Sequence, residues 1–200
     1  MAANSAEPLG AGQLGAEDTL SIRAFFGLPV PEAHCQQLEP YLAACAARAP
    51  EFRWTPVANL HLTIRFIGNV EPSVAEGIAD RLAEQQLVSF TLELGDVGTF
   101  KRGRLVRVVW LQLRVGAEPA RELAAQVEAE CVRAGLVPEA RPFQPHLTVA
   151  RARSRDGNEL PALPATPDLP PWRADELVLY RSHQGRAGAV YEPIRSLRLS

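Results

Sequence analysis

A short motif that occurs twice places the strongest constraint on how this chain can fold. NLHLTIRF covers Asn59–Phe66 and QPHLTVAR covers Gln144–Arg151, so a His-Leu-Thr triplet recurs 85 positions along the chain (146 minus 61). Each copy lies in a stretch rich in β-branched and aromatic residues, which predicts a strand. The repeat therefore predicts two related halves that divide near Lys101, each with a long helix and one copy of the motif.

The repeated residues predict a polar face on each of these strands. Side chains at positions i and i+2 of a strand point to the same side. His61 and Thr63 should therefore share one face, as should His146 and Thr148, while the leucine between them points into the core. A duplicated structural strand would explain the repeated leucine but has no need of a repeated histidine and threonine. We interpret these four polar residues as a functional site.

Two imidazoles on either side of a cleft suit the cleavage of a phosphodiester. One proton must leave the attacking water and another must reach the departing alkoxide, on opposite sides of the phosphorus. Unperturbed histidine titrates near pH 6.5 and can serve either step, while threonine hydroxyls can donate to the non-bridging oxygens. Zinc is the alternative for paired histidines. Neither motif carries Asp, Glu or Cys, and His34 and His183 lie far from both, so we expect no metal and no cofactor.

The order of the predicted elements places the chain in the α+β class, since strands and helices do not alternate regularly as in a doubly wound fold. Helices are expected where apolar residues recur at helical spacing, and strands where they alternate or run together. The expected helices cover 31–48, 72–86 and 118–134. The expected strands cover 19–28, 52–55, 60–67, 89–97, 105–115, 146–150, 176–181 and 190–199, with a turn at 98–104 and a loop at 154–171.

Composition indicates a soluble protein without a membrane segment. The formal net charge of -2 offers no bulk attraction for nucleic acid, so RNA binding would require arginines gathered at a cleft. Three cysteines without CxxC spacing are expected to be reduced thiols in a cytoplasmic protein. No apolar run approaches the roughly 20 residues that span a bilayer. Residues 1–18 are expected to form a disordered tail, and residues 19–200 a single domain that acts as a monomer.

The two motifs also carry a family resemblance. HLTIRF and HLTVAR resemble the paired H-x-[ST] motifs of the two-histidine (2H) phosphoesterases, in particular the RNA 2′,3′-cyclic phosphodiesterase branch, also called 2′-5′ RNA ligase. The similarity extends through SIRAFFGLPVP, RWTPVANLHLTIRFIGNV, GTFKRGRLVRVVWLQL and ELVLYRSHQGRAGAVYEPI. Only 1–18 and 154–171 lie outside it. The resemblance implies a bilobal α+β fold with two pseudo-symmetric lobes and an active-site cleft between them.

The resemblance further implies an activity and a role for each motif residue. The activity is hydrolysis of a terminal RNA 2′,3′-cyclic phosphate to a 2′-phosphate without a metal, so the partner is RNA with such an end or a cyclic nucleotide. His61 would protonate the leaving O3′, and His146 would orient and deprotonate water. Thr63 and Thr148 would hold the phosphate oxygens, and Arg151 would contact the phosphate. The reverse reaction, a 2′-5′ ligation of a cyclic end to a 5′-hydroxyl, is expected only as a secondary activity.

Three further residues are candidates for contact with the substrate. The resemblance places Phe66 where it can stack on the terminal base. Arg23 lies in an apolar strand, where an unpaired charge is costly, and should reach the cleft or a carboxylate. Arg65 shares the face of Thr63 by strict two-residue counting and is a candidate for RNA contact.

Several alternatives stay open at this point. ADP-ribose 1″,2″-cyclic phosphate, a 2′-5′ oligoadenylate or a U-tailed RNA could replace the proposed substrate, and a non-catalytic RNA-binding module is the rival from another class. Trp54 and Trp110 are expected in the core, and the basic turn at 101–104 is expected to be solvated. The sequence does not decide whether Tyr191 lines the cleft or whether 154–171 closes over substrate.

Overall fold

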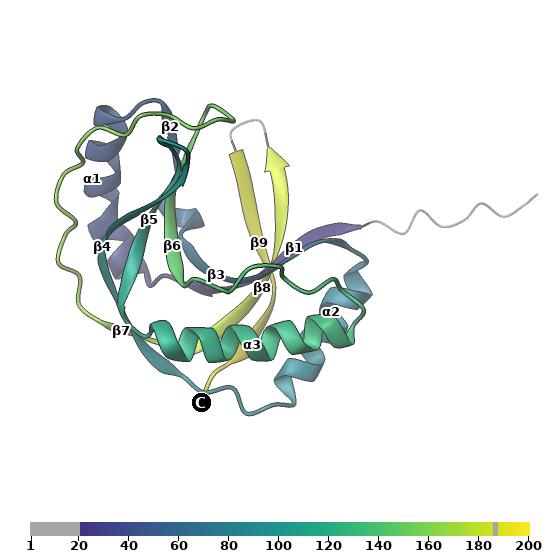
Figure 1. Cartoon of the computed structure of the whole chain (residues 1–200). Helices are drawn as coiled ribbons and strands as arrows, with labels where there is room; N and C mark the ends of the chain where they lie inside the picture. The colour runs from purple at the N-terminus through teal and green to yellow at the C-terminus, as the bar shows by residue number, and fades with distance from the viewer. Residues whose placement is uncertain (1–20, 186–187) are drawn as a thin grey trace, which may run out of the picture.

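Within residues 21–185 and 188–200, the computed structural model contains two antiparallel sheets and three α-helices (Figure 1). The tail expected at 1–18 lies outside the described residues. No helix in these two ranges is both long and apolar enough to cross a membrane. The strands are β1 (Ile22–Pro29), β2 (Phe52–Trp54), β3 (His61–Val70), β4 (Phe90–Arg102), β5 (Leu105–Val115), β6 (His146–Ala152), β7 (Trp172–Ala174), β8 (Glu176–Gly185) and β9 (Gly188–Arg198). The helices are α1 (Glu32–Arg48), α2 (Pro72–Ala83) and α3 (Ala117–Arg133), with a 3-10 turn η1 (Val57–Asn59).

Each motif strand begins the same order of neighbours in its own sheet, although β3 is an edge strand and β6 has β2 on its other side. The first sheet has the strand order β3-β1-β8-β9, and the second has the order β2-β6-β5-β4-β7. Motif strand β3 is thus followed by β1 and β8, just as motif strand β6 is followed by β5 and β4, and the pairs are antiparallel. This repeated order agrees with the expected α+β fold of two pseudo-symmetric lobes.

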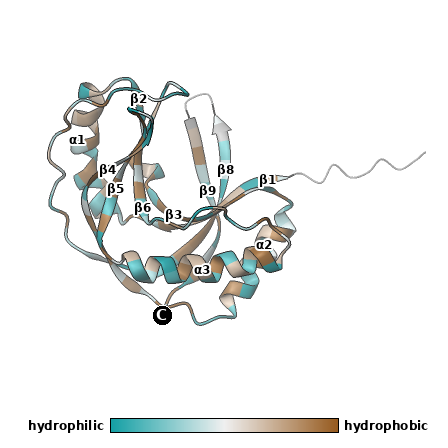
Figure 2. Ribbon diagram, viewed as in Figure 1, coloured by the Kyte–Doolittle hydropathy of each residue, from teal (hydrophilic) through white to brown (hydrophobic). Residues whose placement is uncertain are grey.

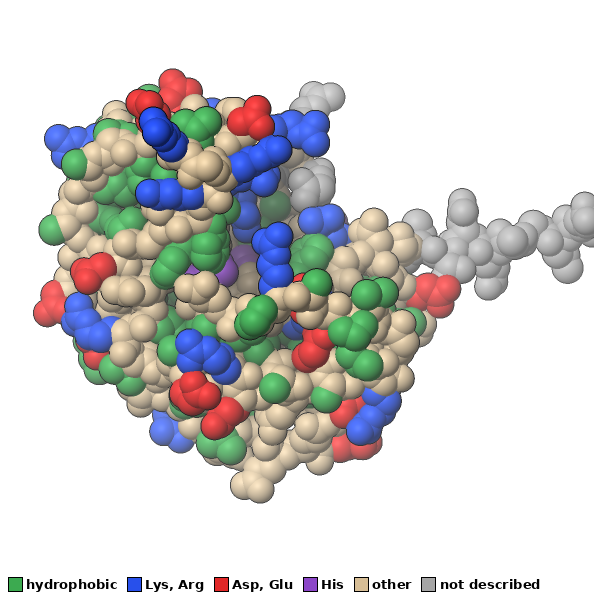
Figure 3. All heavy atoms as spheres, in the orientation of Figure 1, with side chains coloured by type: hydrophobic (Ala, Val, Ile, Leu, Met, Phe, Trp, Pro, Cys, Tyr) green, Lys and Arg blue, Asp and Glu red, His purple; other side chains and the backbone are tan. Residues whose placement is uncertain are grey.

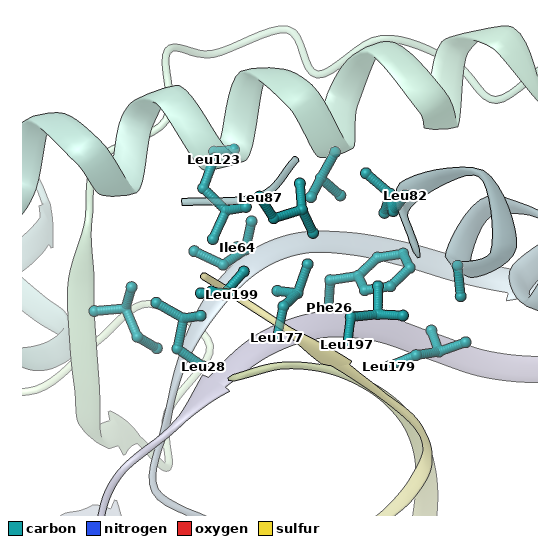
Figure 4. Close-up of a cluster of buried hydrophobic side chains, with 14 of the residues drawn as sticks. Phe26, Leu28, Ile64, Leu82, Leu87, Leu123, Leu177, Leu179, Leu197 and Leu199 are labelled. Atoms are coloured by element: carbon teal, nitrogen blue, oxygen red, sulfur yellow. The ribbon is translucent and has the colours of Figure 1, made fainter. Parts of the chain in front are cut away.

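The two lobes do not correspond to the two halves of the chain. Helix α1 belongs to the core of the second sheet, where Leu38 clusters with Leu147, and α3 belongs to the core of the first sheet, where Leu123 clusters with Ile64. Figure 4 shows the core of the first sheet, between α3 and the strands. Figure 2 shows hydrophobic and hydrophilic residues alternating along α3, as expected for a helix that buries one side. The division expected near Lys101 is therefore wrong, because this residue lies inside β4 and the lobes exchange helices.

The exchange follows from the pairing of distant strands. β1, near the start of the described chain, pairs with β8 close to its end, so both ends contribute to the first sheet. The short strand β2 leaves the first half to pair with β6 of the second. Local sequence patterns report the type of an element and do not report its partner.

The predicted elements form close to their expected positions, with two differences. The turn expected at 98–104 is mostly strand, because β4 continues to Arg102 and only Gly103 and Arg104 connect it to β5. Gly103 has a φ of +59°, the left-handed conformation that two-residue hairpin turns favour. Strand β7, which pairs with β4, was not expected; it follows the loop 154–171.

Candidate active site

The two motif strands meet where the lobes face each other. β3 is in contact with β6, and a cleft of about 630 Å³ opens beside them. His61, Thr63 and Phe66 border this cleft from β3, and Thr148 and Arg151 border it from β6. Figure 3 shows a hollow in the surface with histidine atoms inside it and Lys or Arg side chains around it. The fold therefore brings both copies of the motif to one cleft.

His61, the first residue of β3, is held by a carbonyl and by aromatic rings. Its Nδ1 lies 2.7 Å from the carbonyl oxygen of Asn59. Because a carbonyl only accepts, Nδ1 carries the proton and Nε2 is the ring nitrogen left for chemistry. Phe25 packs on the ring with centroids 4.6 Å apart, and Tyr191 meets it edge-on at 4.9 Å. Burial lowers the pKa of His61 to about 4; the charge of Arg151 adds to this effect, and the Asn59 carbonyl opposes it.

His146, the first residue of β6, has a matching environment. Its Nδ1 lies 2.6 Å from the carbonyl oxygen of Gln144, so Nε2 is again the free ring nitrogen. The ring of Phe100 meets it edge-on with centroids 5.0 Å apart, and the ring of Trp110 lies 5.7 Å away. Burial lowers the pKa of His146, the Gln144 carbonyl opposes this shift, and the charge of Arg151 adds to it. Burial therefore favours the neutral form of both imidazoles in the free protein.

Arg151 connects the two imidazoles electrostatically. Its positive charge lowers the pKa of both His61 and His146, so the guanidinium lies within electrostatic range of both rings. His146 does not itself border the cavity, but Thr148, which follows it by two residues on the same strand, does. An anion bound beside Arg151 would therefore interact electrostatically with both histidines.

A β-bulge in β3 determines which residues follow Thr63 into the cleft. Thr63 and Arg65 pair with adjacent residues of β1, so Ile64 between them is one residue too many for regular pairing. Ile64 and Arg65 are consequently both buried, and Phe66 returns to the cleft side with 37% of its surface exposed.

A second bulge lies at the same point of β6. Thr148 and Ala150 pair with adjacent residues of β5, and Val149 is the additional residue. Val149 and Ala150 are both buried, and Arg151 turns outward to border the cleft. The structural repeat thus extends beyond His-Leu-Thr to a bulge and to one further cleft residue, Phe66 in β3 and Arg151 in β6.

Comparison with known families identifies this arrangement. The sequence profile of the 2′-5′ RNA ligase superfamily matches residues 29–186. This chain belongs to that superfamily. The match confirms the family resemblance of the two motifs and covers both of them.

Relatives with names and solved structures support the assignment. The chain is 29% identical over 180 residues to an RNA 2′,3′-cyclic phosphodiesterase of Escherichia coli K12, a match that covers 89% of this chain and 97% of that one. An RNA 2′,3′-cyclic phosphodiesterase of Aeropyrum pernix is 40% identical over 105 residues, which span 52% of this chain and 58% of the relative. The crystal structure of E. coli LigT complexed with 3′-AMP matches with a TM-score of 0.79 and 28% identity, over 90% of this chain and 99% of that chain. The crystal structure of TT0787 of Thermus thermophilus matches with a TM-score of 0.74 and 25% identity, over 89% and 98%.

Arg65 has a different role in this superfamily member from the one expected. Its side chain is only 8% exposed and forms ion pairs with Glu128 of α3 and with Glu139. Its Nη2 also donates to the carbonyl oxygen of Val137 at 2.8 Å. The expected RNA contact by Arg65 is therefore wrong: the bulge at Ile64 reverses the alternation, and the side chain ties β3 to α3.

Arg23 and Phe66 lie together at the border of the cleft. The guanidinium carbon of Arg23 is 4.5 Å from the centroid of the Phe66 ring, a cation–π contact. Of the two positions anticipated for Arg23, cleft or carboxylate, the structure has the cleft. Tyr191 borders the cleft as well, and Trp54 does so while also packing on the second core.

Sequence reasoning missed several residues of the cleft. Arg53 and Arg153 border it and are exposed. The alternation Arg-Ala-Arg at 151–153 was a signal for one of them, but Arg53 reaches the cleft only because β2 pairs with β6. Asn59 supplies the carbonyl for His61, and its Nδ2 donates to the carbonyl oxygen of Ala189 on β9 at 2.7 Å. Among the described residues, no group of three or more His, Cys, Asp or Glu side chains is arranged to hold a metal ion.

Proposed function

We propose that this chain is an RNA 2′,3′-cyclic phosphodiesterase, which hydrolyses the cyclic phosphate at an RNA end to a 2′-phosphomonoester without a metal. The observation that carries the proposal is the duplicated half-site: His61, Thr63, Thr148 and Arg151 border one cleft, and His146 begins the strand that carries Thr148. Both histidines have Nδ1 held by a carbonyl and Nε2 free, and the charge of Arg151 acts on both imidazoles. Relatives that match nearly end to end carry the name RNA 2′,3′-cyclic phosphodiesterase, which supports the choice of substrate.

The reaction is an in-line displacement at phosphorus. A water oxygen bonds to phosphorus as the bond from phosphorus to O3′ breaks. Nε2 of His146 takes a proton from the water, and Nε2 of His61 gives a proton to O3′; the resemblance of each motif to its family counterpart supports this choice of roles. Thr63 and Thr148 donate to the non-bridging oxygens, whose charge grows in the transition state. One chain supplies both half-sites, so we propose that the monomer is the active unit.

The negative charge of the substrate favours protonation of His61, which must act as the acid. In the free protein the pKa of His61 is about 4, so this ring is unprotonated at neutral pH. Burial is the main cause of this low pKa, and the charge of Arg151 is a lesser one. A phosphodiester anion bound beside Arg151 offsets that charge and itself favours the protonated ring. The pKa of His61 then rises, and the ring can take up the proton that it later donates. Substrate binding and proton uptake are therefore coupled.

The border of the cleft offers a surface for the terminal base. The Phe66 ring is exposed and backed by Arg23, an arrangement on which a terminal base can stack.

The three cysteines of the chain are free, buried thiols, a state that the reducing cytoplasm maintains. We therefore place RNA as the partner and the cytoplasm as the location.

Hydrolysis of a defined oligonucleotide tests the function. An oligonucleotide with a 2′,3′-cyclic end is incubated with the protein in excess EDTA, and phosphorus NMR distinguishes a 2′-phosphate from a 3′-phosphate product. His61→Ala and His146→Ala should each lower kcat by about 10²–10⁴-fold. An active double variant, or a 3′-phosphate product, would contradict the proposal. Faster turnover of ADP-ribose 1″,2″-cyclic phosphate or of a 2′-5′ oligoadenylate would move the function to those substrates, and affinity without turnover would indicate a binding module.

A further inference from the structure

The cleft carries more positive charge than one reacting phosphate requires. Arg23, Arg53, Arg151 and Arg153 border it, and no described Asp or Glu does. Within residues 21–185 and 188–200, Arg53, Arg151 and Arg153 form no ion pair with a carboxylate. The whole chain has a formal net charge of -2, so this concentration of arginine is a local feature. It indicates that the cleft binds an extended anion.

Three of these arginines lie on one face of the β2–β6 pair. Arg53 is the direct cross-strand partner of Arg151. The pairing continues past the end of β6, because the backbone N–H of Arg153 donates to the carbonyl oxygen of Glu51 at 3.0 Å. Cross-strand partners share a face, and residues two apart on a strand share a face at a spacing of about 6.6 Å. Like charges placed opposite each other destabilise a sheet, a cost that a bound anion would offset.

The side chains at this end of the cleft are partly preorganised. Nε of Arg153 donates to the carbonyl oxygen of Pro50 at 3.1 Å, which fixes the side chain and leaves its terminal nitrogens for a ligand. Nε1 of Trp54 donates to the carbonyl oxygen of Ala49 at 3.1 Å, so the edge of this ring is held while the residue borders the cleft. A row of arginines along the cleft is the arrangement that follows the backbone phosphates of a single nucleic acid strand.

We propose that Arg53 and Arg153 form a subsite for a second phosphate of the RNA, the phosphodiester on the 5′ side of the cyclic end, while Arg151 serves the reacting phosphate. This inference rests on the proposed function and names its substrate class: an oligonucleotide end in preference to a cyclic mononucleotide. The spacing of about 6.6 Å along the strand suits successive phosphates of one nucleic acid strand.

The experiment measures kcat/KM for two substrates that differ by one nucleotide, which brings one additional phosphodiester. These are adenosine 2′,3′-cyclic phosphate and the dinucleotide ApA with a 2′,3′-cyclic end. The wild type should prefer the dinucleotide, and Arg53→Gln/Arg153→Gln should lower the ratio of the two kcat/KM values by about 10–100-fold, as expected when charge-assisted hydrogen bonds are removed. The slope of log KM for the dinucleotide against log salt concentration should fall by about 0.7 for each phosphate that is no longer paired with an arginine.

A matched control removes the same charge elsewhere. Arg121→Gln/Arg198→Gln alters two exposed arginines that do not border the cleft and should leave the ratio and the salt slope within about twofold of the wild type. Thermal unfolding of both double variants checks that the fold is intact. An equal loss on both substrates would overturn the subsite, as would an unchanged ratio or a wild type without preference for the dinucleotide.

Failure of the subsite and failure of the function give different results. If the wild type hydrolyses neither substrate, the proposed function is wrong, and the subsite is then tested by binding alone. The dissociation constants of adenosine 2′-monophosphate and of ApA with a 2′-phosphate are compared by calorimetry. Arg53→Gln/Arg153→Gln must weaken only the dinucleotide by about tenfold or more for the subsite to stand; equal affinities in wild type and variant would overturn it.

Discussion

The two half-sites share a backbone frame and differ in what they present to the substrate. In each, the histidine begins a strand, its Nδ1 faces the carbonyl two residues earlier, and a bulge follows the threonine. The residue that emerges after the bulge is Phe66 in one copy and Arg151 in the other. The duplicated backbone thus positions two equivalent imidazoles and hydroxyls, and the position after the bulge provides an aromatic ring in one half and a cation in the other.

The two histidines also differ in the aromatic rings that pack against them. His61 packs against Phe25 and Tyr191 of its own sheet, and burial takes its pKa to about 4. His146 packs against Phe100 and Trp110, and burial lowers its pKa as well. The two half-sites therefore share a backbone frame and a direction of pKa shift but have different neighbours, and substitutions at matching positions can separate what is shared from what is specific.

Substitutions of Arg151 and of Phe66 are expected to differ most in their effect on kcat/KM. Arg151→Gln should lower kcat/KM by about 10²–10³-fold on every cyclic phosphate tested, because it removes the charge nearest the developing oxyanion. It should also move the acid limb of the pH profile to higher pH, since the positive charge that lowers the pKa of both histidines is lost. Initial rates measured from acidic to mildly alkaline pH give both effects.

Phe66→Ala serves as the matched variant from the other half-site. It should lower kcat/KM only about tenfold, and only with substrates that carry a base, because the Phe66 ring contributes by stacking. Ribose 2′,3′-cyclic phosphate, which has no base, should react with this variant at nearly the wild-type rate. Equal losses on both substrates would show that the two positions do not have separate roles.

The glycines that face the two histidine environments offer a second contrast. A Cβ added at Gly98 would lie 2.3 Å from the Trp110 ring, which itself packs near His146. A Cβ added at Gly27 would lie 3.3 Å from Cδ2 of His61, a much milder approach. Gly98→Ala should therefore destabilise the protein by about 1–3 kcal/mol and lower kcat, because the indole must move.

Gly27→Ala should have a smaller effect on both quantities. Urea unfolding of the two variants gives the stabilities, and kcat with a cyclic-ended dinucleotide gives the activities. A greater loss at Gly27 would mean that the half-site of His61 is the less tolerant one, contrary to the distances.

The comparison also explains how far sequence reasoning could go. The motif, its strands and the polar face of His61 and Thr63 follow from local patterns, and so does the α+β class. The failure at Arg65 has a definite cause: counting by two assumes a regular strand, and the bulge at Ile64 is fixed by pairing with β1. Arg53 was missed for a related reason, because its place at the cleft depends on the pairing of β2 with a strand from the other half of the chain.

The smallest expected effect concerns pH and stability. The pKa of His61 is about 4 in the folded protein and near 6.5 in an unfolded chain, so the unfolded state binds more protons between these values. The contribution of neutral His61 to the free energy of unfolding should therefore be fully present above pH 6.5 and decline as the pH falls towards 4. His61→Gln removes this pH dependence. The stability of the wild type relative to the variant should therefore fall by about 1 kcal/mol from about pH 7 to about pH 5, after allowance for solvent screening.

His146→Gln provides the comparison within the same protein. Its pKa is lowered in the same direction, so its removal should also flatten the pH dependence, and any difference between the two variants measures how unequally the half-sites bury their imidazoles. Urea unfolding at several pH values across this range supplies the free energies. A steeper loss of stability on acidification in His61→Gln than in the wild type would mean that this imidazole is not held neutral by burial, and the coupling of substrate binding to proton uptake would lose its basis.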